Sequence, residues 1–203
     1  MNLTGHTVST LALVLLLVMD AVFACVVDWE HLRSLQGLAY LGVRTTTAIV
    51  VAGRRAALSL NTRPLILSAC LWSFVQPYGV YFMSLTAAMR DSQLANTFLT
   101  LSSLLSLAVT ITLGRSFGVR PALRELVCGG PFRIVRHPLY ATYVIADVAL
   151  LYLLPSLPIL LLIVSGWVAL GVRIAAEERA LSVDPAWRDY AGVVRNRLIP
   201  FLL

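Results

Sequence analysis

Long apolar stretches are the feature that most constrains how this chain can fold. Six runs carry no charged residue or only one: 7–27, 35–53, 64–88, 94–113, 139–154 and 157–172. A helix needs about 20 mostly apolar residues to cross a bilayer, and most of the runs approach that length. Backbone groups in hydrocarbon must be satisfied internally, and the runs lack the alternation of a membrane β-barrel. We therefore expect an all-α, polytopic transmembrane bundle of five to six spans.

The overall composition agrees with a membrane protein. Hydrophobic residues make up 59% of the chain and charged residues 13%, against about a quarter charged in an average soluble domain. The first run has no basic residues before it and is too long for a signal peptide, so we interpret it as a retained span. There is no repeat or linker. We expect one integral membrane domain over 1–203, with N-terminal spans in 1–113 and a catalytic, cofactor-binding part in 114–203.

The distribution of arginine predicts the orientation in the membrane. All sixteen basic residues are arginines, and ten of them lie in the C-terminal half. They concentrate in 54–63, 115–136 and 173–197, whereas the short loops 28–34 and 90–93 hold one arginine each. Cytoplasmic loops carry the excess of arginine in membrane proteins. We therefore expect these three segments, the N-terminus and the active site to face the cytoplasm.

Charge and cysteine content argue against several other classes of protein. The net charge of +6 suits anionic lipid headgroups or an anionic ligand. Binding to nucleic acid is not indicated, because the arginines alternate with apolar spans and form no continuous basic face. Cys25, Cys70 and Cys128 lie far apart without a Cys-x-x-Cys pair, so neither a disulfide framework nor a metal site is predicted.

Three charged residues interrupt the apolar runs, namely Asp20, Arg44 and Asp147. Ionisable residues within spans are costly and are therefore functional candidates. A structural salt bridge between Asp20 and Arg44 is the simpler interpretation of that pair. Asp147 lies about 15 Å along a helix from His137, which is deep for a cytoplasmic site but compatible with a substrate pocket.

Two polar segments, 114–143 and 173–200, hold most of the potential for chemistry, and a hairpin of the last two spans would bring them side by side. Pro138 is a helix-start signal, so His137 should lie at the N-terminus of the fifth span, where free N–H groups favour a carboxylate. Tyr140 would lie one turn further in. Arg173 and Glu177 share a helix face, although a simple surface ion pair would explain their spacing equally well.

The ordered set of polar motifs resembles the isoprenylcysteine carboxyl methyltransferase family. The segment Gly-Pro-Phe-Arg-Ile-Val-Arg-His-Pro-Leu-Tyr at 130–140 is followed by a hydrophobic hairpin, Arg173-x-x-x-Glu177-Glu178, and a closing Tyr190 with Arg195 and Arg197. Membrane phospholipid N-methyltransferases share this general pattern. Two positions depart from it, with Thr142 in place of a frequent glycine and Trp187 in place of a tyrosine.

The resemblance implies a methyltransferase that uses S-adenosylmethionine, releases S-adenosylhomocysteine and works within the lipid bilayer. The acceptor would be a lipophilic small molecule or prenylated substrate, such as an isoprenylcysteine-type carboxylate. Neither its identity nor the oligomeric state is indicated. The implied cofactor-binding residues are Arg136, His137, Pro138, Tyr140, Glu177, Glu178 and Tyr190. The implied catalytic residues are Arg173 and Glu177, and the substrate-binding residues are Arg173, Asp147 and Arg195.

Two other functions fit parts of the sequence. A membrane reductase of the sterol-reductase type, which uses NADPH, resembles the same C-terminal architecture. A small transporter would instead use Asp20, Arg44 and Asp147 to line a pathway. Binding of S-adenosylhomocysteine or of NADPH separates the two enzymes.

Overall fold

A computed structural model of the chain describes residues 63–84, 89–116 and 126–200, with the short stretches 59–60 and 122–123 and scattered positions before residue 51. The first predicted span and most of the second lie outside the described residues, as do Asp20 and Arg44. The longer helices are α4 (Pro64–Ser84), α5 (Gln93–Leu113), α6 (Pro138–Leu153) and α7 (Leu157–Leu181). The shorter elements are β1 (Ser59–Leu60), the 3-10 helix η1 (Gly114–Ser116), β2 (Ala122–Leu123), the 3-10 helix η2 (Gly130–Arg133) and α8 (Pro185–Val193).

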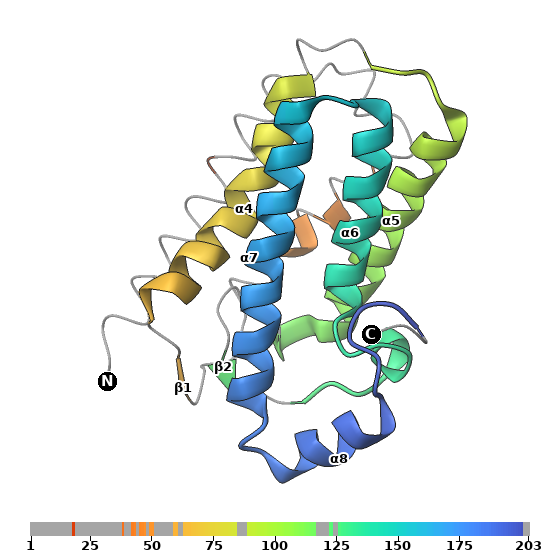
Figure 1. Cartoon of the computed structure of the whole chain (residues 1–203). Coiled ribbons are helices and arrows are strands. Elements are labelled where there is room, and N and C mark those ends of the chain that lie inside the picture. The colour runs from red at the N-terminus through yellow and green to blue at the C-terminus, as the bar shows by residue number, and fades with distance from the viewer. Residues whose placement is uncertain are drawn as a thin grey trace.

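The four long helices form a bundle in which α5 packs on α6 and α4 packs on α7 (Figure 1). Helices α6 and α7 are joined by a short turn and form the predicted hairpin. Each long helix falls on a predicted span, so the helical assignment is confirmed for the described part. Helix α7 continues beyond the apolar run, which ends at residue 172, to Leu181, so Arg173 and Glu177 lie on one helix as the sequence predicted. Buried Ile174 and Ala176 keep this polar extension packed on the protein.

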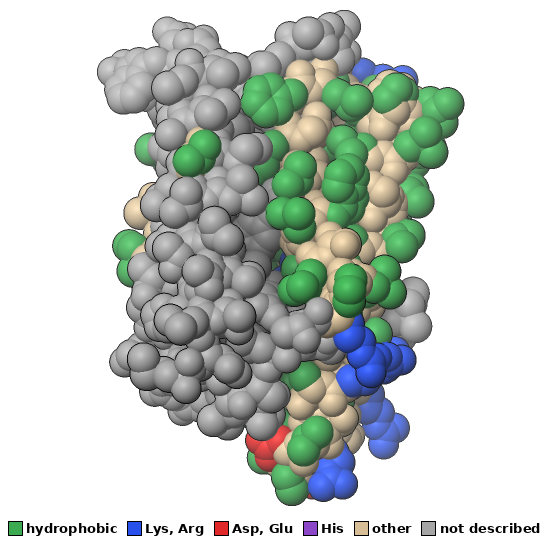
Figure 2. Space-filling model, turned by 90° about the vertical axis from the view of Figure 1, so that its left-hand side faces the viewer, with side chains coloured by type: hydrophobic (Ala, Val, Ile, Leu, Met, Phe, Trp, Pro, Cys, Tyr) green, Lys and Arg blue, Asp and Glu red, His purple; other side chains and the backbone are tan. Residues whose placement is uncertain are grey.

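Two of the helices are long and apolar enough to cross a membrane. Helix α5 has a mean hydropathy of 1.7 and α7 one of 2.2. Only 33% of the 18-residue apolar segment of α5, and 39% of that of α7, is buried inside the protein. Much of their apolar surface is therefore exposed. Figure 2 shows hydrophobic side chains along the length of the described helices, with most of the arginines toward one end. Such a surface is stable in lipid rather than in water, as expected for an integral membrane protein.

Local capping sets where the helices begin. The Ser92 side chain accepts a hydrogen bond from the Ala95 N–H at the start of α5, and Asp184 accepts one from Ala186 at the start of α8. Helix α6 begins at Pro138 directly after His137, as the sequence predicted. Proline is favoured in the first turn because its missing N–H would have no partner within the helix there.

Buried hydroxyl groups hold α5 against α6. Ser102 Oγ donates to the Thr142 carbonyl at 2.6 Å, and Ser106 Oγ lies 2.6 Å from Thr142 Oγ1. Small polar residues of this kind allow close approach of helices and hydrogen bonds across membrane interfaces. Thr142, which departs from the family pattern, thus supplies a polar contact that glycine could not make through a side chain.

One end of the bundle gathers the polar elements. The start of α4, the end of α5, the start of α6 and the end of α7 lie there together with α8 (Figure 1). Strands β1 and β2 pair antiparallel at the same end, with Ser59 opposite Leu123. We call this the polar end. The described parts of all three arginine-rich segments therefore lie on one side of the apolar bundle, whereas Arg90 N donates to the Leu153 carbonyl at the other end.

The α5–α6 contact can be tested with Thr142→Val. The change removes the acceptor of the Ser106 hydroxyl while preserving side-chain shape, and we expect it to lower the free energy of unfolding by about 1 kcal/mol. Thermal unfolding in detergent measures the effect. Thr112→Val is the matched control, because the exposed Thr112 hydroxyl donates to the Ala108 carbonyl within its own helix. Equal loss in both variants would contradict the proposed contact.

Candidate active site

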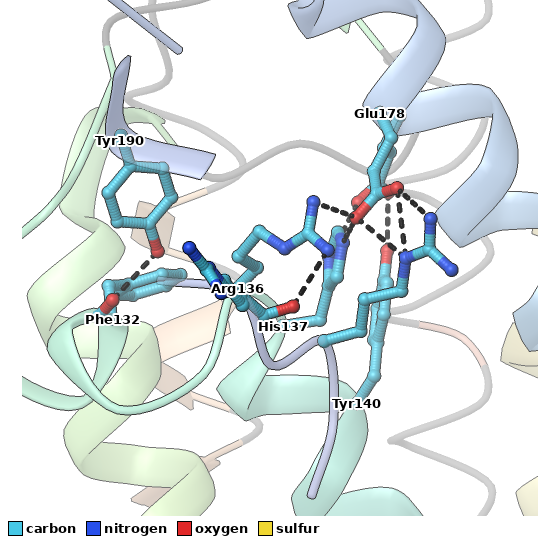
Figure 3. A network of polar contacts seen from close by, with 9 residues as sticks. Phe132, Arg136, His137, Tyr140, Glu178 and Tyr190 are labelled. Carbon is cyan, nitrogen blue, oxygen red and sulfur yellow. Dashed lines mark hydrogen bonds and ion pairs between the residues drawn. The ribbon is translucent and has the colours of Figure 1, made fainter. Parts of the chain in front are cut away.

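The two predicted polar segments meet at the polar end, between the start of α6 and the end of α7. The hairpin brings them together, because the chain that enters α6 at His137 leaves α7 near Glu178 on the same side. Figure 3 shows the side chains directed toward one another. The site is therefore built from residues about forty positions apart in sequence.

His137 lies between two glutamates. Its Nδ1 atom is 3.8 Å from Glu177 Oε2, and its Nε2 atom is 3.3 Å from Glu178 Oε1. The imidazole is 8% exposed. The sequence predicted that Glu178 would point away from the face of Glu177, and the structure shows that the two carboxylates approach different nitrogens of the same ring.

Glu178 is held by three cationic or N–H-bearing side chains. In addition to His137, Arg136 Nη1 lies 3.0 Å from Glu178 Oε1, and Arg197 Nη2 lies 3.0 Å from Oε2. Arg197 Nε also donates to both carboxylate oxygens. Charge-assisted bonds of this length are the stronger class of hydrogen bond. Glu178 therefore acts mainly as the electrostatic anchor of the polar end.

Glu177 lies beside Tyr140, and its contacts to cationic side chains are longer than those of Glu178. The Tyr140 hydroxyl donates a hydrogen bond to Glu177 Oε1, whereas Arg173 Nη2 is 3.9 Å from the same oxygen. The Tyr140 ring stacks on His137 with centroids 5.6 Å apart. Compared with Glu178, Glu177 keeps more capacity to accept a hydrogen bond from a ligand.

Arg173 lies beneath this cluster as a buried cation. The residue is 6% exposed, and its guanidinium carbon is 5.0 Å from the centre of the Tyr140 ring. Among the described residues, its buried Nε atom has no hydrogen-bond partner. A buried guanidinium donor without a partner is costly, so this atom marks a place where an anionic or carbonyl ligand would be stabilised.

The chain after α8 crosses the start of α6. Arg136 N donates to the Asn196 carbonyl at 2.9 Å and His137 N to the Arg197 carbonyl at 2.8 Å. The Arg136 side chain donates to the carbonyl of Arg195. The backbone N–H of His137, at the helix start where the sequence predicted N–H groups open to a carboxylate, is therefore already bonded. Arg195 joins the site through its carbonyl, while the residue itself is exposed.

Tyr190 and Trp187, both on α8, brace the site from the side. The Tyr190 hydroxyl donates to the Phe132 carbonyl at 2.7 Å (Figure 3), and burial raises its pKa to about 12. The guanidinium carbon of Arg136 lies 5.8 Å from the centre of the Trp187 ring. Tyr190 thus connects α8 to η2, and the departure to tryptophan at position 187 provides a cation–π contact.

The structure brings together most, but not all, of the residues singled out in the sequence. The convergent set comprises Arg136, His137, Pro138, Tyr140, Arg173, Glu177 and Glu178. Asp147 lies apart from it and accepts a hydrogen bond from Trp167. Arg197 was not predicted as a site residue. Its only signal in the sequence is its place in the closing basic motif.

A comparison with protein families matches one segment of the chain. Residues 94–183 match the isoprenylcysteine carboxyl methyltransferase (ICMT) family. The match confirms the resemblance and spans α5, α6 and α7 with the convergent residues they carry. Helix α8 and the segment that crosses the start of α6 follow it. No curated protein matches the chain. As ICMT is a methyltransferase family, the match supports a membrane methyltransferase.

The anchoring role of Arg197 can be tested against Arg195 as an internal control. Arg197→Ala removes the side chain that bonds Glu178, so we expect amide hydrogen exchange at Arg136 and His137 to accelerate severalfold. Arg195→Ala keeps the carbonyl that Arg136 uses and should leave these rates unchanged. Exchange measured by mass spectrometry decides the matter, and identical behaviour of both variants would refute the anchor.

Proposed function

We propose that this protein transfers a methyl group from S-adenosylmethionine to a lipophilic carboxylate, such as an isoprenylcysteine, at the polar end of the bundle. The observation that carries the proposal is the convergence of His137, Tyr140 and Glu177 above the buried Arg173. The match to the ICMT family supports the reaction class. The arginine-rich segments support an active site that faces the cytoplasm.

The residue types fit the two ends of the donor's amino-acid tail. Glu177, whose cationic neighbours are more distant than those of Glu178, would accept from the donor's ammonium, because a carboxylate accepts several hydrogen bonds. Arg136 and His137 would meet its carboxylate. When bound, S-adenosylmethionine would supply a methyl group already activated on a positively charged sulfur. Tyr140, whose ring already faces a guanidinium, offers a π-face to that charge.

Arg173 is the residue that we assign to the acceptor. A buried guanidinium can hold a carboxylate in bidentate geometry and compensate for the water that it loses. The unpartnered Nε atom supports this role. In-line transfer then depends mainly on alignment of the carboxylate oxygen with the methyl group and on exclusion of water. The lipid-exposed helices would admit the acceptor's apolar part from the membrane.

The donor site is tested by comparing the two neighbouring glutamates. Glu177→Gln should weaken S-adenosylhomocysteine binding at least tenfold, because a charge-assisted bond contributes about 1.5–3 kcal/mol, with little change in thermal stability. Glu178→Gln should instead lower stability, since Arg136 and Arg197 lose their partner. Isothermal titration calorimetry and thermal unfolding give the two readouts. Asp189→Asn, the same kind of change at an exposed position on α8, is the control.

Two results would contradict the assignment of the donor site. One is S-adenosylhomocysteine binding that is equally tight in native protein and Glu177→Gln. The other is tight NADPH binding without S-adenosylhomocysteine binding, which would favour the reductase.

The acceptor site is tested with Arg173→Lys, which keeps the charge and removes the planar fork of donors. With S-farnesylcysteine as acceptor, we expect KM to rise about tenfold and S-adenosylhomocysteine affinity to change much less. The carboxamide of the same compound serves as a matched competitor. Native protein should prefer the carboxylate, and this preference should be smaller in Arg173→Lys, because a bidentate pair becomes a contact with a single point charge. An unchanged preference would remove Arg173 from the acceptor site.

A further inference from the structure

A third aromatic ring on α6 lies next to the site and has no role in the proposed methyl transfer. Tyr143 follows Tyr140 by three residues, and the two rings are tilted with their centroids 6.1 Å apart. Tyr140 in turn stacks on His137. Tyr143 also lies within electrostatic range of Arg173, the residue assigned to the acceptor. The row of rings along α6 therefore continues one turn beyond the residues used so far.

Tyr143 lies on the inner face of α6 and is nevertheless exposed. Residues three and four apart share a helix face, so Tyr143 continues the face formed by Leu139 and Tyr140. Leu139 is 8% exposed and Tyr140 5%, whereas Tyr143 is 38% exposed. The face that is closely packed at the start of α6 is therefore open one turn further along. A ligand can reach the ring and the hydroxyl of Tyr143 from this side.

The neighbours of Arg173 differ in their access to such a ligand. Besides Tyr143, the side chains of Tyr140, Glu177 and Cys70 lie within electrostatic range of the guanidinium. Cys70 and Tyr140 are buried, and Glu177 is partly buried. Tyr143 is the most exposed of these four residues. A molecule that approaches Arg173 from the open side of α6 would therefore contact Tyr143.

The phenol of Tyr143 suits a lipophilic carboxylate. Tyrosine combines an apolar ring with a hydroxyl that donates a hydrogen bond, so it can contact both parts of such a molecule. A carboxylate offers about four lone-pair sites on its two oxygens. Arg173 and a phenol can therefore bind the same carboxylate, and a lone pair remains for attack on the methyl group.

We propose that Tyr143 is an acceptor-binding residue whose hydroxyl donates a hydrogen bond to the carboxylate that Arg173 holds. The inference rests on the proposed function for the place and the chemistry of the acceptor. It extends that function by naming a second side chain that selects a carboxylate and fixes its orientation.

The experiment measures methylation of S-farnesylcysteine by Tyr143→Phe, which removes the hydroxyl and keeps the ring. The KM for this acceptor should rise about tenfold, while thermal stability and S-adenosylhomocysteine affinity change much less. The preference for the carboxylate over its carboxamide should also become smaller, because a hydrogen bond to a charged acceptor is stronger than one to a neutral acceptor. A purely structural role of Tyr143 would not alter this preference.

Tyr152→Phe is the matched control. Tyr152 is also an exposed tyrosine on α6, and its ring lies 5.8 Å from the guanidinium carbon of an arginine, but that arginine is Arg90 at the other end of the bundle. The same loss of a hydroxyl there should leave the KM and the preference for the carboxylate at their native values.

Two results would overturn the inference while leaving the proposed function in place. One is a native KM in Tyr143→Phe together with a raised KM in Tyr143→Ala, which would mean that only the ring contacts the acceptor. The other is an equal change in Tyr143→Phe and Tyr152→Phe. Native protein that does not bind S-adenosylhomocysteine, or does not methylate S-farnesylcysteine, would contradict the proposed function itself, and the inference would fall with it.

Discussion

Two neighbouring glutamates at the end of α7 hold the start of α6, and the arrangement of the polar end depends on this contact. Glu178 contacts Arg136, His137 and Arg197. Glu177 lies near the other nitrogen of the His137 ring and accepts a hydrogen bond from Tyr140. These charges lie at the edge of an apolar bundle, where unpaired ions are costly. Their pairing therefore fixes the ends of two helices and the chain that crosses them.

The same arrangement separates structural from chemical roles among similar residues. Glu178 is enclosed by short contacts to cations, whereas the contacts of Glu177 to His137 and Arg173 are longer. A carboxylate with spare acceptor capacity can bind a ligand without dismantling the fold. For this reason we assign the donor's ammonium to Glu177 and a structural role to Glu178.

Buried donors at the polar end indicate where a ligand would be stabilised. Among the described residues, the Nε atoms of Arg136 and Arg173 are buried without a hydrogen-bond partner. Arg173 also lies beside the Tyr140 ring and 3.9 Å from Glu177 Oε1. Under the proposed function, an acceptor that enters from lipid would place its carboxylate against this guanidinium.

Sequence patterns alone predicted the helical class, the four long helices of the described part, the start of α6 at Pro138 and the resemblance to the ICMT family. The length of an apolar run, the position of a proline and the order of motifs can be read from the sequence without knowledge of how the helices pack. Only the tertiary structure decided that both glutamates flank one imidazole, that Arg197 completes the cluster and that Asp147 pairs with Trp167. The reason is that these contacts join residues far apart in the chain, and helix rotation and the path of the C-terminal segment set which polar atoms meet.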